Sequence, residues 1–234
     1  MYFGERILIA AAIIPAVLLL LYVYKKDRLE KESTKLLLIL VVLGILSTLM
    51  ASATENAGIA FLPFIVAAGS TAYNIVLYYI VVGLSEEGFK YLVMRWKTWR
   101  NPEFNCQFDG VVYSVFVALG FALFENIMYV FQYGFATAVA RAVTAVPGHA
   151  CFGVFMGVFY GAAKRLEKMG RKGNSKACRL LAVIIPMFLH GTYDFLASSS
   201  ASSGYVWSFV VFVIALFFAA YLLVKKLSAN DSYM

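Results

Sequence analysis

Charged residues are scarce in this chain, and its cysteines are few and irregularly spaced. Of the 234 residues, 14% are charged and 62% hydrophobic, with a mean hydropathy of +0.79, whereas a soluble domain carries about 25% charged and about 45–50% apolar residues. This composition excludes an ordinary soluble domain and a disordered chain, and it predicts an integral membrane protein. Cys106, Cys151 and Cys178 show neither paired spacing nor a CxxC motif. We therefore expect reduced thiols, with no disulfide framework and no cysteine metal motif.

Long apolar runs occupy most of the sequence. At about 20 residues per crossing helix, a chain of this length accommodates about six to eight spans and no large soluble domain. We predict an all-α polytopic membrane protein, a helical bundle of about seven transmembrane helices that forms a single integral-membrane domain over residues 1–234. A shorter apolar stretch near 59–68 is interrupted by Pro63, and we interpret it as an interfacial or re-entrant piece. The predicted spans are Phe3–Tyr24, Leu36–Thr54, Thr71–Met94, Gly110–Tyr133, Thr137–Gly161, Cys178–Ser198 and Tyr205–Val224.

Basic residues occur in alternate connections between these spans. This alternation is the pattern that the positive-inside rule describes, so we predict a multi-pass protein with its amino terminus outside and its carboxyl terminus in the cytoplasm. The net charge of +7 then reflects contact with anionic membrane lipids, and no nucleic-acid partner is expected. Lysine and arginine gather in the segments 25–35, 95–100, 164–179 and 225–226, and they are absent from the turns 51–60, 132–137 and 198–205.

The spans nevertheless contain ionisable side chains. Each charged group near the bilayer centre costs about 2.5–3.5 kcal/mol on insertion scales, so we interpret these residues as a functional site. A simpler alternative is that the i,i+4 pairs Glu86–Lys90 and His190–Asp194 only hold helices together. Counted at about 1.5 Å per residue, His149 and His190 lie at the same depth, so they can meet. The polar residues of the spans are Glu86, Glu87, Lys90, Glu125, Asn126, Tyr129, Arg141, His149, His190 and Asp194.

Carboxylates and imidazoles in an apolar cavity can activate water. The preferred interpretation is a hydrolase that requires no cofactor, in which Glu86 or Glu87 deprotonates the attacking water; the sequence leaves open which of the two is the base. His149 and His190 orient the water or donate a hydrogen bond to the oxyanion, and Lys90 balances the glutamate pair. Supporting contacts are expected from Glu125, Asn126, Tyr129, Asp194 and Arg141, the last of which either reaches outward or neutralises Glu125.

Other functions stay open at this stage. The chain has neither GxSxG nor HExxH, the signatures of serine hydrolases and of many zinc proteases. A Zn²⁺ site assembled from separate helices, with His149, His190 and Glu125 as ligands, is the mechanistic alternative. A proton-coupled transporter could relay protons through the same carboxylates, although no sequence repeat is visible between the halves. A non-catalytic scaffold or immunity protein would use the polar cluster only to lock helices.

Small residues in the fifth predicted span favour close helix packing. Gly153, Gly157 and Gly161 follow one another at intervals of four residues, which places them on one helix face. Pro147 and Gly148 directly precede His149, and we expect a kink or local unwinding there that re-aims the histidine.

The polar residues fall into ordered motifs that resemble a known family. Residues 86–90, Glu-Glu-Gly-Phe-Lys, resemble an EExxK motif, and residues 120–129 resemble a GFAxxENxxY helix. His149 and the HxxxD sequence of residues 190–194 match two later motifs. In this order, over a motif-bearing core at about residues 71–198, they resemble the PrsW family of bacterial intramembrane proteases.

The resemblance implies a protease of the bacterial cell membrane that acts in an envelope stress response. Its substrate would be a single-pass membrane protein, an anti-sigma factor, in which it makes the first, extracytoplasmic-side (site-1) cut. The resemblance also implies that Glu86, Glu87 and His149 are needed for activity. The family is distantly similar to the CAAX prenyl endopeptidases, from which this chain departs: Lys90 stands one residue before the arginine of EExxxR, and there is no FxxxH.

Overall fold

The computed structural model describes residues 3–199 and 203–234 and is helical almost throughout. Within the described residues there is no β-strand, and the only extended pairing is an isolated antiparallel bridge between Cys106 and Tyr233. In order, the elements are α1 (Phe3–Lys26), α2 (Thr34–Phe61), the 3-10 turn η1 (Leu62–Phe64), α3 (Thr71–Ile75), the π-helix η2 (Val76–Leu84), α4 (Ser85–Thr98), α5 (Asp109–Tyr133), α6 (Phe135–Val143), α7 (Ala145–Lys168), α8 (Lys172–Ser199) and α9 (Ser203–Ala229).

Within residues 3–199 and 203–234, six helical stretches are long and apolar enough to cross a membrane. They correspond to the predicted spans except the third, and the polytopic all-α prediction is confirmed. The third predicted span is a continuous helical run through α3, η2 and α4, residues 71–98. Its length suits a crossing, but Glu86, Glu87, Lys90, Arg95 and Lys97 lower its apolar character.

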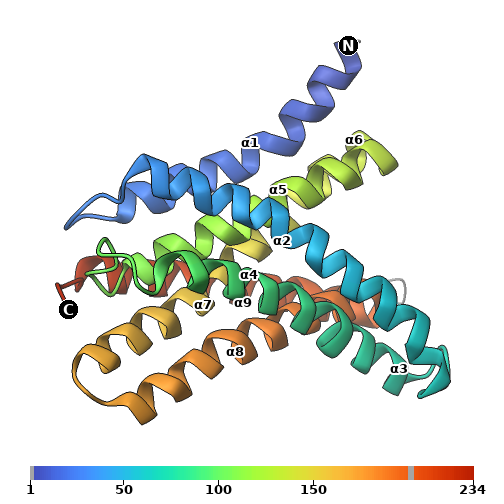
Figure 1. Cartoon of the computed structure of the whole chain (residues 1–234). Helices are drawn as coiled ribbons and strands as arrows, with labels where there is room; N and C mark the ends of the chain where they lie inside the picture. The colour runs from blue at the N-terminus through green and yellow to red at the C-terminus, as the bar shows by residue number, and fades with distance from the viewer. Residues whose placement is uncertain (1–2, 200–202) are drawn as a thin grey trace.

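Helix α5 is the centre of the bundle. Figure 1 shows α1 and α2 on one side of it and α7, α8 and α9 on the other, and α5 packs against α1, α2, α4, α6 and α7. In the apolar part of α5, 72% of the residues are buried inside the protein, whereas the corresponding shares are 17% for α1 and 11% for α9. The outer helices therefore present most of their apolar surface outward, as lipid-facing helices do.

Glycines allow α5 and α7 to approach closely. A Cβ atom at Gly157 would lie 2.3 Å from Ser114 Oγ and 2.4 Å from Val111 Cα, and one at Gly161 would lie 2.1 Å from the carbonyl oxygen of Gln107. The hydroxyl of Ser114 donates a hydrogen bond of 2.6 Å across this contact to the carbonyl of Gly153. The predicted glycine packing face is confirmed, and it fixes the distance between two helices that carry site residues.

Two local predictions differ from the structure. The stretch near 59–68 is not a re-entrant helix: residues 59–61 complete α2, and the short 3-10 turn that follows leaves Phe64 and Ile65 86% and 81% exposed, as in an interfacial turn. The fifth predicted span is divided at Thr144, whose φ of −124° and ψ of −73° separate α6 from α7. The break comes before Pro147, which lies in the first turn of α7, where a proline removes no intrahelical hydrogen bond.

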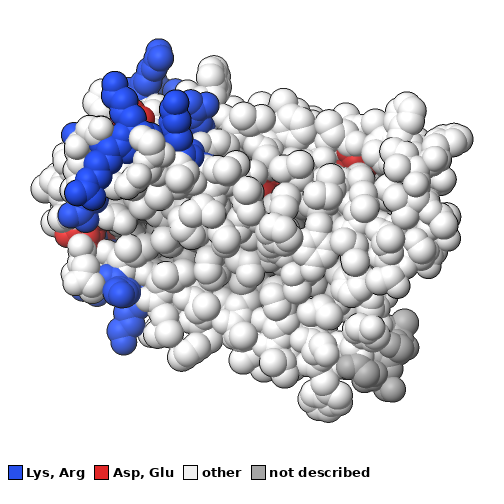
Figure 2. All heavy atoms as spheres, turned by 90° about the horizontal axis from the view of Figure 1, so that it is seen from below, with Lys and Arg blue, Asp and Glu red and all other residues white. Residues whose placement is uncertain are grey.

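Lysines and arginines gather at one end of the bundle, hereafter the basic end, where α1, α4, α7 and α9 finish and α8 begins. Figure 2 shows this concentration of basic side chains, with a few acidic ones among them. The helices bear basic residues in their last turns, such as Lys25 in α1, Arg95 in α4 and Arg165 in α7. Such residues also interact favourably with the negative end of the helix dipole.

Candidate active site

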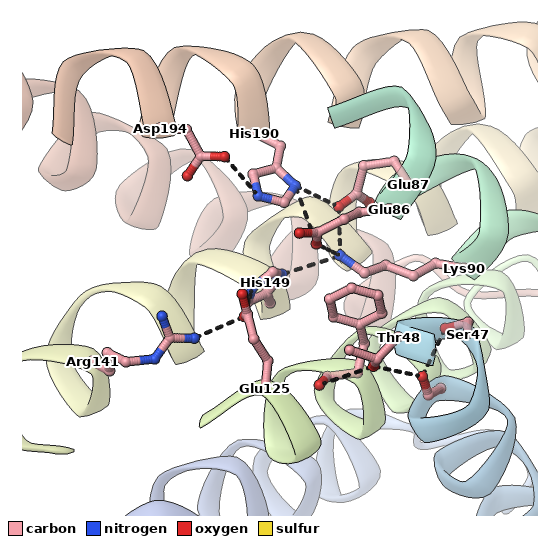
Figure 3. Close-up of polar contacts among 12 residues, drawn as sticks. Ser47, Thr48, Glu86, Glu87, Lys90, Glu125, Arg141, His149, His190 and Asp194 are labelled. Atoms are coloured by element: carbon pink, nitrogen blue, oxygen red, sulfur yellow. Dashed lines mark hydrogen bonds and ion pairs between the residues drawn. The ribbon is translucent and has the colours of Figure 1, made fainter. Parts of the chain in front are cut away.

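The polar residues of the spans converge on one place inside the bundle. They come from α4, α5, α6, α7 and α8, and we call this group the intramembrane cluster (Figure 3). As expected from the sequence, separate helices bring the ionisable side chains of the predicted site close to one another. The cluster consists of Glu86, Glu87, Lys90, Glu125, Arg141, His149, His190 and Asp194.

Lys90 lies at the centre of the cluster. Its ammonium nitrogen is 3.0 Å from Glu86 Oε2, 2.8 Å from Glu87 Oε1 and 3.2 Å from His149 Nδ1. The same nitrogen lies 3.9 Å from the centre of the Phe121 ring, a favourable cation–π distance. A lysine side chain that is 1% exposed thus has its charge offset on every side.

Each histidine is held between two charged groups. His149 Nδ1 faces the Lys90 ammonium, which can only donate, while Nε2 is 2.9 Å from Glu125 Oε2. This arrangement fixes a neutral tautomer, in which Nδ1 accepts a hydrogen bond and Nε2 donates one. His190 Nδ1 is 3.0 Å from Glu87 Oε1, and its Nε2 is 3.4 Å from Asp194 Oδ2. With a carboxylate at both nitrogens, His190 is placed to donate on both sides.

The two imidazoles lie side by side. Their ring centres are 5.2 Å apart with the planes nearly perpendicular, and Phe152 stacks on His190 at 4.8 Å. Each imidazole has a separate carboxylate on its outer nitrogen, Glu125 for His149 and Asp194 for His190. Outer carboxylates of this kind orient histidines that bind metals or move protons.

The supporting residues hold Glu125 in position. Arg141 Nη2 donates to Glu125 Oε2 at 2.7 Å, and Arg141 Nε donates to Asn126 Oδ1 at 3.0 Å. Asn126 Nδ2 in turn donates to the carbonyl of Ala12 in α1 at 2.9 Å, and the Arg141 guanidinium lies over the Tyr129 ring. Of the two roles considered for Arg141, the structure shows neutralisation of Glu125.

A cavity of about 250 Å³ opens onto the cluster. It has room for several water molecules beside a peptide group. Glu87, which is fully buried, is not among the lining residues, so of the two adjacent acids only Glu86 faces the cavity. The acidic, basic and imidazole side chains that line it are Glu55, Glu86, Glu125, Arg141, His149, His190 and Asp194.

Glu55 is the site residue that the sequence analysis missed. The predicted span ended at Thr54, which left Glu55 in a turn, but α2 continues to Phe61 and carries Glu55 to the cavity wall. Its Oε1 atom is buried without a hydrogen-bond partner. One signal in the sequence could have identified it. Glu55 comes seven residues, or two helical turns, after Thr48, and it therefore lies on the face of α2 that packs against α5.

The donor set fits a metal ion. Glu86, Glu87, His149 and His190 each offer a ligand atom, and these atoms all lie within 4.8 Å of one another. Two histidines with carboxylate are a recognised catalytic zinc arrangement, and the buried Glu87 Oε2 has no hydrogen-bond partner. Glu125, which the zinc alternative named as a ligand, is outside this group and instead contacts His149 from behind. The Lys90 ammonium makes the contacts that a bound cation would take over.

The comparisons with known proteins agree with this geometry. Residues 32–222 match the family described as "PrsW family intramembrane metalloprotease". The chain is 36% identical to the "Protease PrsW" of Geobacillus kaustophilus over 94% of this chain and 91% of the relative. It is 31% identical to that of Oceanobacillus iheyensis over 95% and 97%, and 29% identical to that of Bacillus subtilis over 94% of each chain. No solved structure matches this chain. The chain therefore belongs to the PrsW family of intramembrane proteases, and it is a peptidase.

Proposed function

We propose that this chain is an endopeptidase that hydrolyses a membrane-anchored protein in the cavity of the intramembrane cluster. The observation that carries the proposal is the convergence of Glu86, His149 and His190, from three helices, on one cavity with room for water. Hydrolysis of a peptide bond needs a base for the water, a group that stabilises the oxyanion and a donor for the leaving amine. The cluster offers candidates for all three.

The roles follow from what faces the cavity. Glu86 lines the cavity and is the candidate base that deprotonates water, whereas Glu87 is enclosed and holds Lys90 and His190 in place. His190, placed to donate on both sides, can supply a proton to the oxyanion or to the leaving nitrogen. Glu125 and Arg141 position His149 on the other wall.

The family description and the donor set favour the metal-assisted form of this chemistry over the cofactor-free form. Glu87, His149 and His190 would hold the ion and leave Glu86 as the base, and a bound zinc ion would make water a stronger nucleophile and polarise the scissile carbonyl. Lys90 would then leave its present contacts, and Glu125 and Asp194 would keep the two imidazoles oriented.

The cavity lies away from the basic end. Counted at about 1.5 Å per residue, Glu125 is about 24 Å along α5 from Asp109, and His190 is about 27 Å along α8 from Lys172. If the basic end is cytoplasmic, as the positive-inside rule indicates, the cavity lies toward the outer leaflet. This placement supports a site-1 cut on the extracytoplasmic side of a single-pass substrate, and together with the resemblance it supports an anti-sigma factor as that substrate.

The test is cleavage of a tagged single-pass anti-sigma factor co-expressed with the chain. Glu86→Gln, His149→Ala and His190→Ala are each expected to lower cleavage by at least about 100-fold at unchanged protein level. Lys225→Ala, at an exposed site on α9, is the matched control and is expected to cleave normally. Normal cleavage in the three site variants would end the assignment. Loss of activity on chelation, restored by Zn²⁺, would support the metal-assisted form, and chelator-resistant cleavage would support the cofactor-free form.

A further inference from the structure

Three segments that are far apart in the sequence meet at the basic end. The loop 27–33 follows α1, the loop 99–108 precedes α5, and the tail 230–234 follows α9. The tail is tied to the second loop by the bridge between Cys106 and Tyr233 and by a hydrogen bond of 2.7 Å from the Met234 amide to the Asn105 carbonyl. Asp231 Oδ1 also accepts a hydrogen bond of 3.0 Å from the amide of Phe108.

The acidic residues of these segments have no ionic partners. Among the described residues, none of them lies within 4.0 Å of a lysine, arginine or histidine nitrogen. Their partners are neutral: Asp109 accepts from the amides of Asn105 and Cys106, and Glu32 accepts from the hydroxyl of Tyr113 at 2.8 Å. The nearby Lys31 ammonium bonds to the carbonyl oxygens of Tyr24 and Asp27 and to no carboxylate. The acidic residues are Asp27, Glu30, Glu32 and Glu103 in the loops, Asp231 in the tail, and Asp109 at the adjoining start of α5.

Three of the side chains form a compact set of metal-type ligands. Cys106 Sγ and one oxygen each of Asp109 and Asp231 lie within 4.8 Å of one another. Cys106 and Asp109 are each 1% exposed, and Asp231 Oδ2 is buried without a hydrogen-bond partner. Ligands of a tetrahedral zinc ion, at about 2.0–2.3 Å from the metal, lie somewhat closer together than this limit, so only a small contraction would be needed.

The surroundings of Asp27 are a second, independent observation that favours a bound cation at this place. It is 1% exposed, and no hydrogen bond of good geometry reaches either of its carboxylate oxygens, although the backbone amide of Glu32 lies nearby. Its charge acts on Cys106, Asp109 and Asp231, so it belongs to the same surroundings. A buried carboxylate with no partner is unfavourable, because nothing replaces the water that it loses. We call Asp27, Glu32, Cys106, Asp109 and Asp231 the basic-end acidic cluster.

We propose that Cys106, Asp109 and Asp231, with Asp27 beside them, bind a divalent transition-metal ion such as Zn²⁺, at a site separate from the intramembrane cluster. The thiolate selects a transition metal over Mg²⁺ or Ca²⁺, which prefer oxygen ligands only. On binding, the Cys106 thiol releases its proton to water and the sulfur forms the bond to the metal. From the sequence, Cys106 had no predicted role, because Asp231 lies far from Cys106 and Asp109 along the chain and the three form no recognised motif. The site would join the tail to the start of α5.

Binding of cobalt(II) provides a test, because it gives a spectroscopic signal that the candidate active site cannot produce. No cysteine belongs to the ligand group of the intramembrane cluster, so a thiolate-to-cobalt charge-transfer band in the near ultraviolet can come only from a site with a cysteine. The full chain, purified in detergent and stripped of metal, is expected to develop this band as one equivalent of Co²⁺ binds, and Zn²⁺ is expected to abolish it. A wild-type chain that binds Co²⁺ without such a band, or binds none, would overturn the proposal without recourse to any variant.

Variants then assign the ligands. Cys106→Ser is expected to lose the band, while the matched control Cys178→Ser, at a free and half-buried cysteine of α8, keeps it. Asp231→Asn is expected to weaken Zn²⁺ binding at least about 10-fold in a chelator competition. The double variant Glu86→Gln/His149→Ala is expected to keep the band, which separates this site from the proposed catalytic one. A band that survives Cys106→Ser would overturn the assignment of the site.

Discussion

In the intramembrane cluster acids alternate with bases, whereas in the basic-end acidic cluster acids stand together. Glu86 and Glu87 share Lys90, and Glu125 lies between Arg141 and His149. At the basic end, no hydrogen bond of good geometry reaches either carboxylate oxygen of Asp27, although Figure 2 shows lysines and arginines gathered at this end of the molecule. A cluster inside the bundle is shielded from bulk water, so its charges are best neutralised by one another. In a cluster near the water boundary, protons or a bound metal ion from solution can neutralise the carboxylates.

The largest expected effect is a loss of stability when the intramembrane cluster, like the basic-end acidic cluster, is left without a cation. Lys90→Met removes the cation that Glu86 and Glu87 share and is expected to lower the free energy of unfolding by about 3–5 kcal/mol, because it leaves buried carboxylates unpaired. Thermal unfolding in detergent would measure this, with Lys225→Met as the exposed control. A loss below about 1 kcal/mol would show that these acids do not depend on Lys90. Recovery of stability with Zn²⁺ would show that another cation can replace it.

The next effect concerns the helix contact beneath the intramembrane cluster. Gly157→Ala would place a methyl group 2.4 Å from Val111 Cα and 2.5 Å from the Gly110 carbonyl oxygen, so α5 and α7 must separate. We expect a destabilisation of about 1–3 kcal/mol, together with lower cleavage, since these helices carry Glu125 and His149. Gly88→Ala is the matched control: nothing lies within 4 Å of its new methyl group, and a small gain in stability is expected. Equal effects of both substitutions would contradict the close contact.

A smaller effect is expected at the edge of the cavity. Arg141→Ala leaves Glu125 without its ion pair of 2.7 Å and loosens the carboxylate that orients His149. We expect cleavage to fall about 10-fold with the fold retained, as is typical when the outer partner of a functional histidine is removed. Initial cleavage rates of reconstituted protein would measure it, and Arg141→Lys should restore part of the activity. An unchanged rate in Arg141→Ala would show that Glu125 is positioned by other contacts.

The smallest expected effect is a pH dependence of stability that arises from the basic-end acidic cluster. Burial, reinforced by Asp231, raises the pKa of Asp27 from 3.8 to about 6, and burial, reinforced by Asp109, raises the pKa of Glu32 from 4.5 to about 9. The folded chain therefore keeps protons that the unfolded chain releases near pH 4, so its stability should fall as the pH rises from about 4 to about 9.

Asp27→Asn removes part of this dependence. In the presence of a chelator we expect the variant to be more stable than the wild type by on the order of 1 kcal/mol at pH 8 and to be equal to it at pH 4. Unfolding curves at the two pH values would measure the difference, with Glu167→Gln, also at the basic end, as the control. Equal stability of Asp27→Asn and the wild type at pH 8 would show that Asp27 bears no unfavourable charge.

The sequence predicted the helices and most of the candidate site, because both depend on patterns within single segments. Apolar runs of about 20 residues set the spans, and polar residues within those runs, such as Glu86, His149 and His190, were conspicuous against lipid. Their similar depth followed from the rise of the helix and from the alternation of basic loops.

What the sequence could not show depends on contacts between segments. The sequence predicted that Lys90 balances Glu86 and Glu87, but the contact of Lys90 with His149 joins α4 to α7, and hydropathy does not record it. Glu55 was missed because α2 extends beyond its apolar run. The break at Thr144 has no proline or glycine at its own position to mark it. The basic-end acidic cluster joins residues 27, 32, 106, 109 and 231, and no periodicity links positions so far apart.

The π-helix η2, residues 76–84, comes directly before Ser85 and the glutamate pair. A π-helical segment takes up more residues per turn than an α-helix, so it sets the angle at which the following helix presents its side chains. Removal of one residue within 76–84 would turn Glu86 and Glu87 relative to α3 by the rotation of one residue, and the pair would no longer point at His190. The length of this segment, rather than its composition, is therefore under constraint: substitutions that keep it apolar should be tolerated, while an insertion or deletion of a single residue should disconnect the acids from the imidazoles.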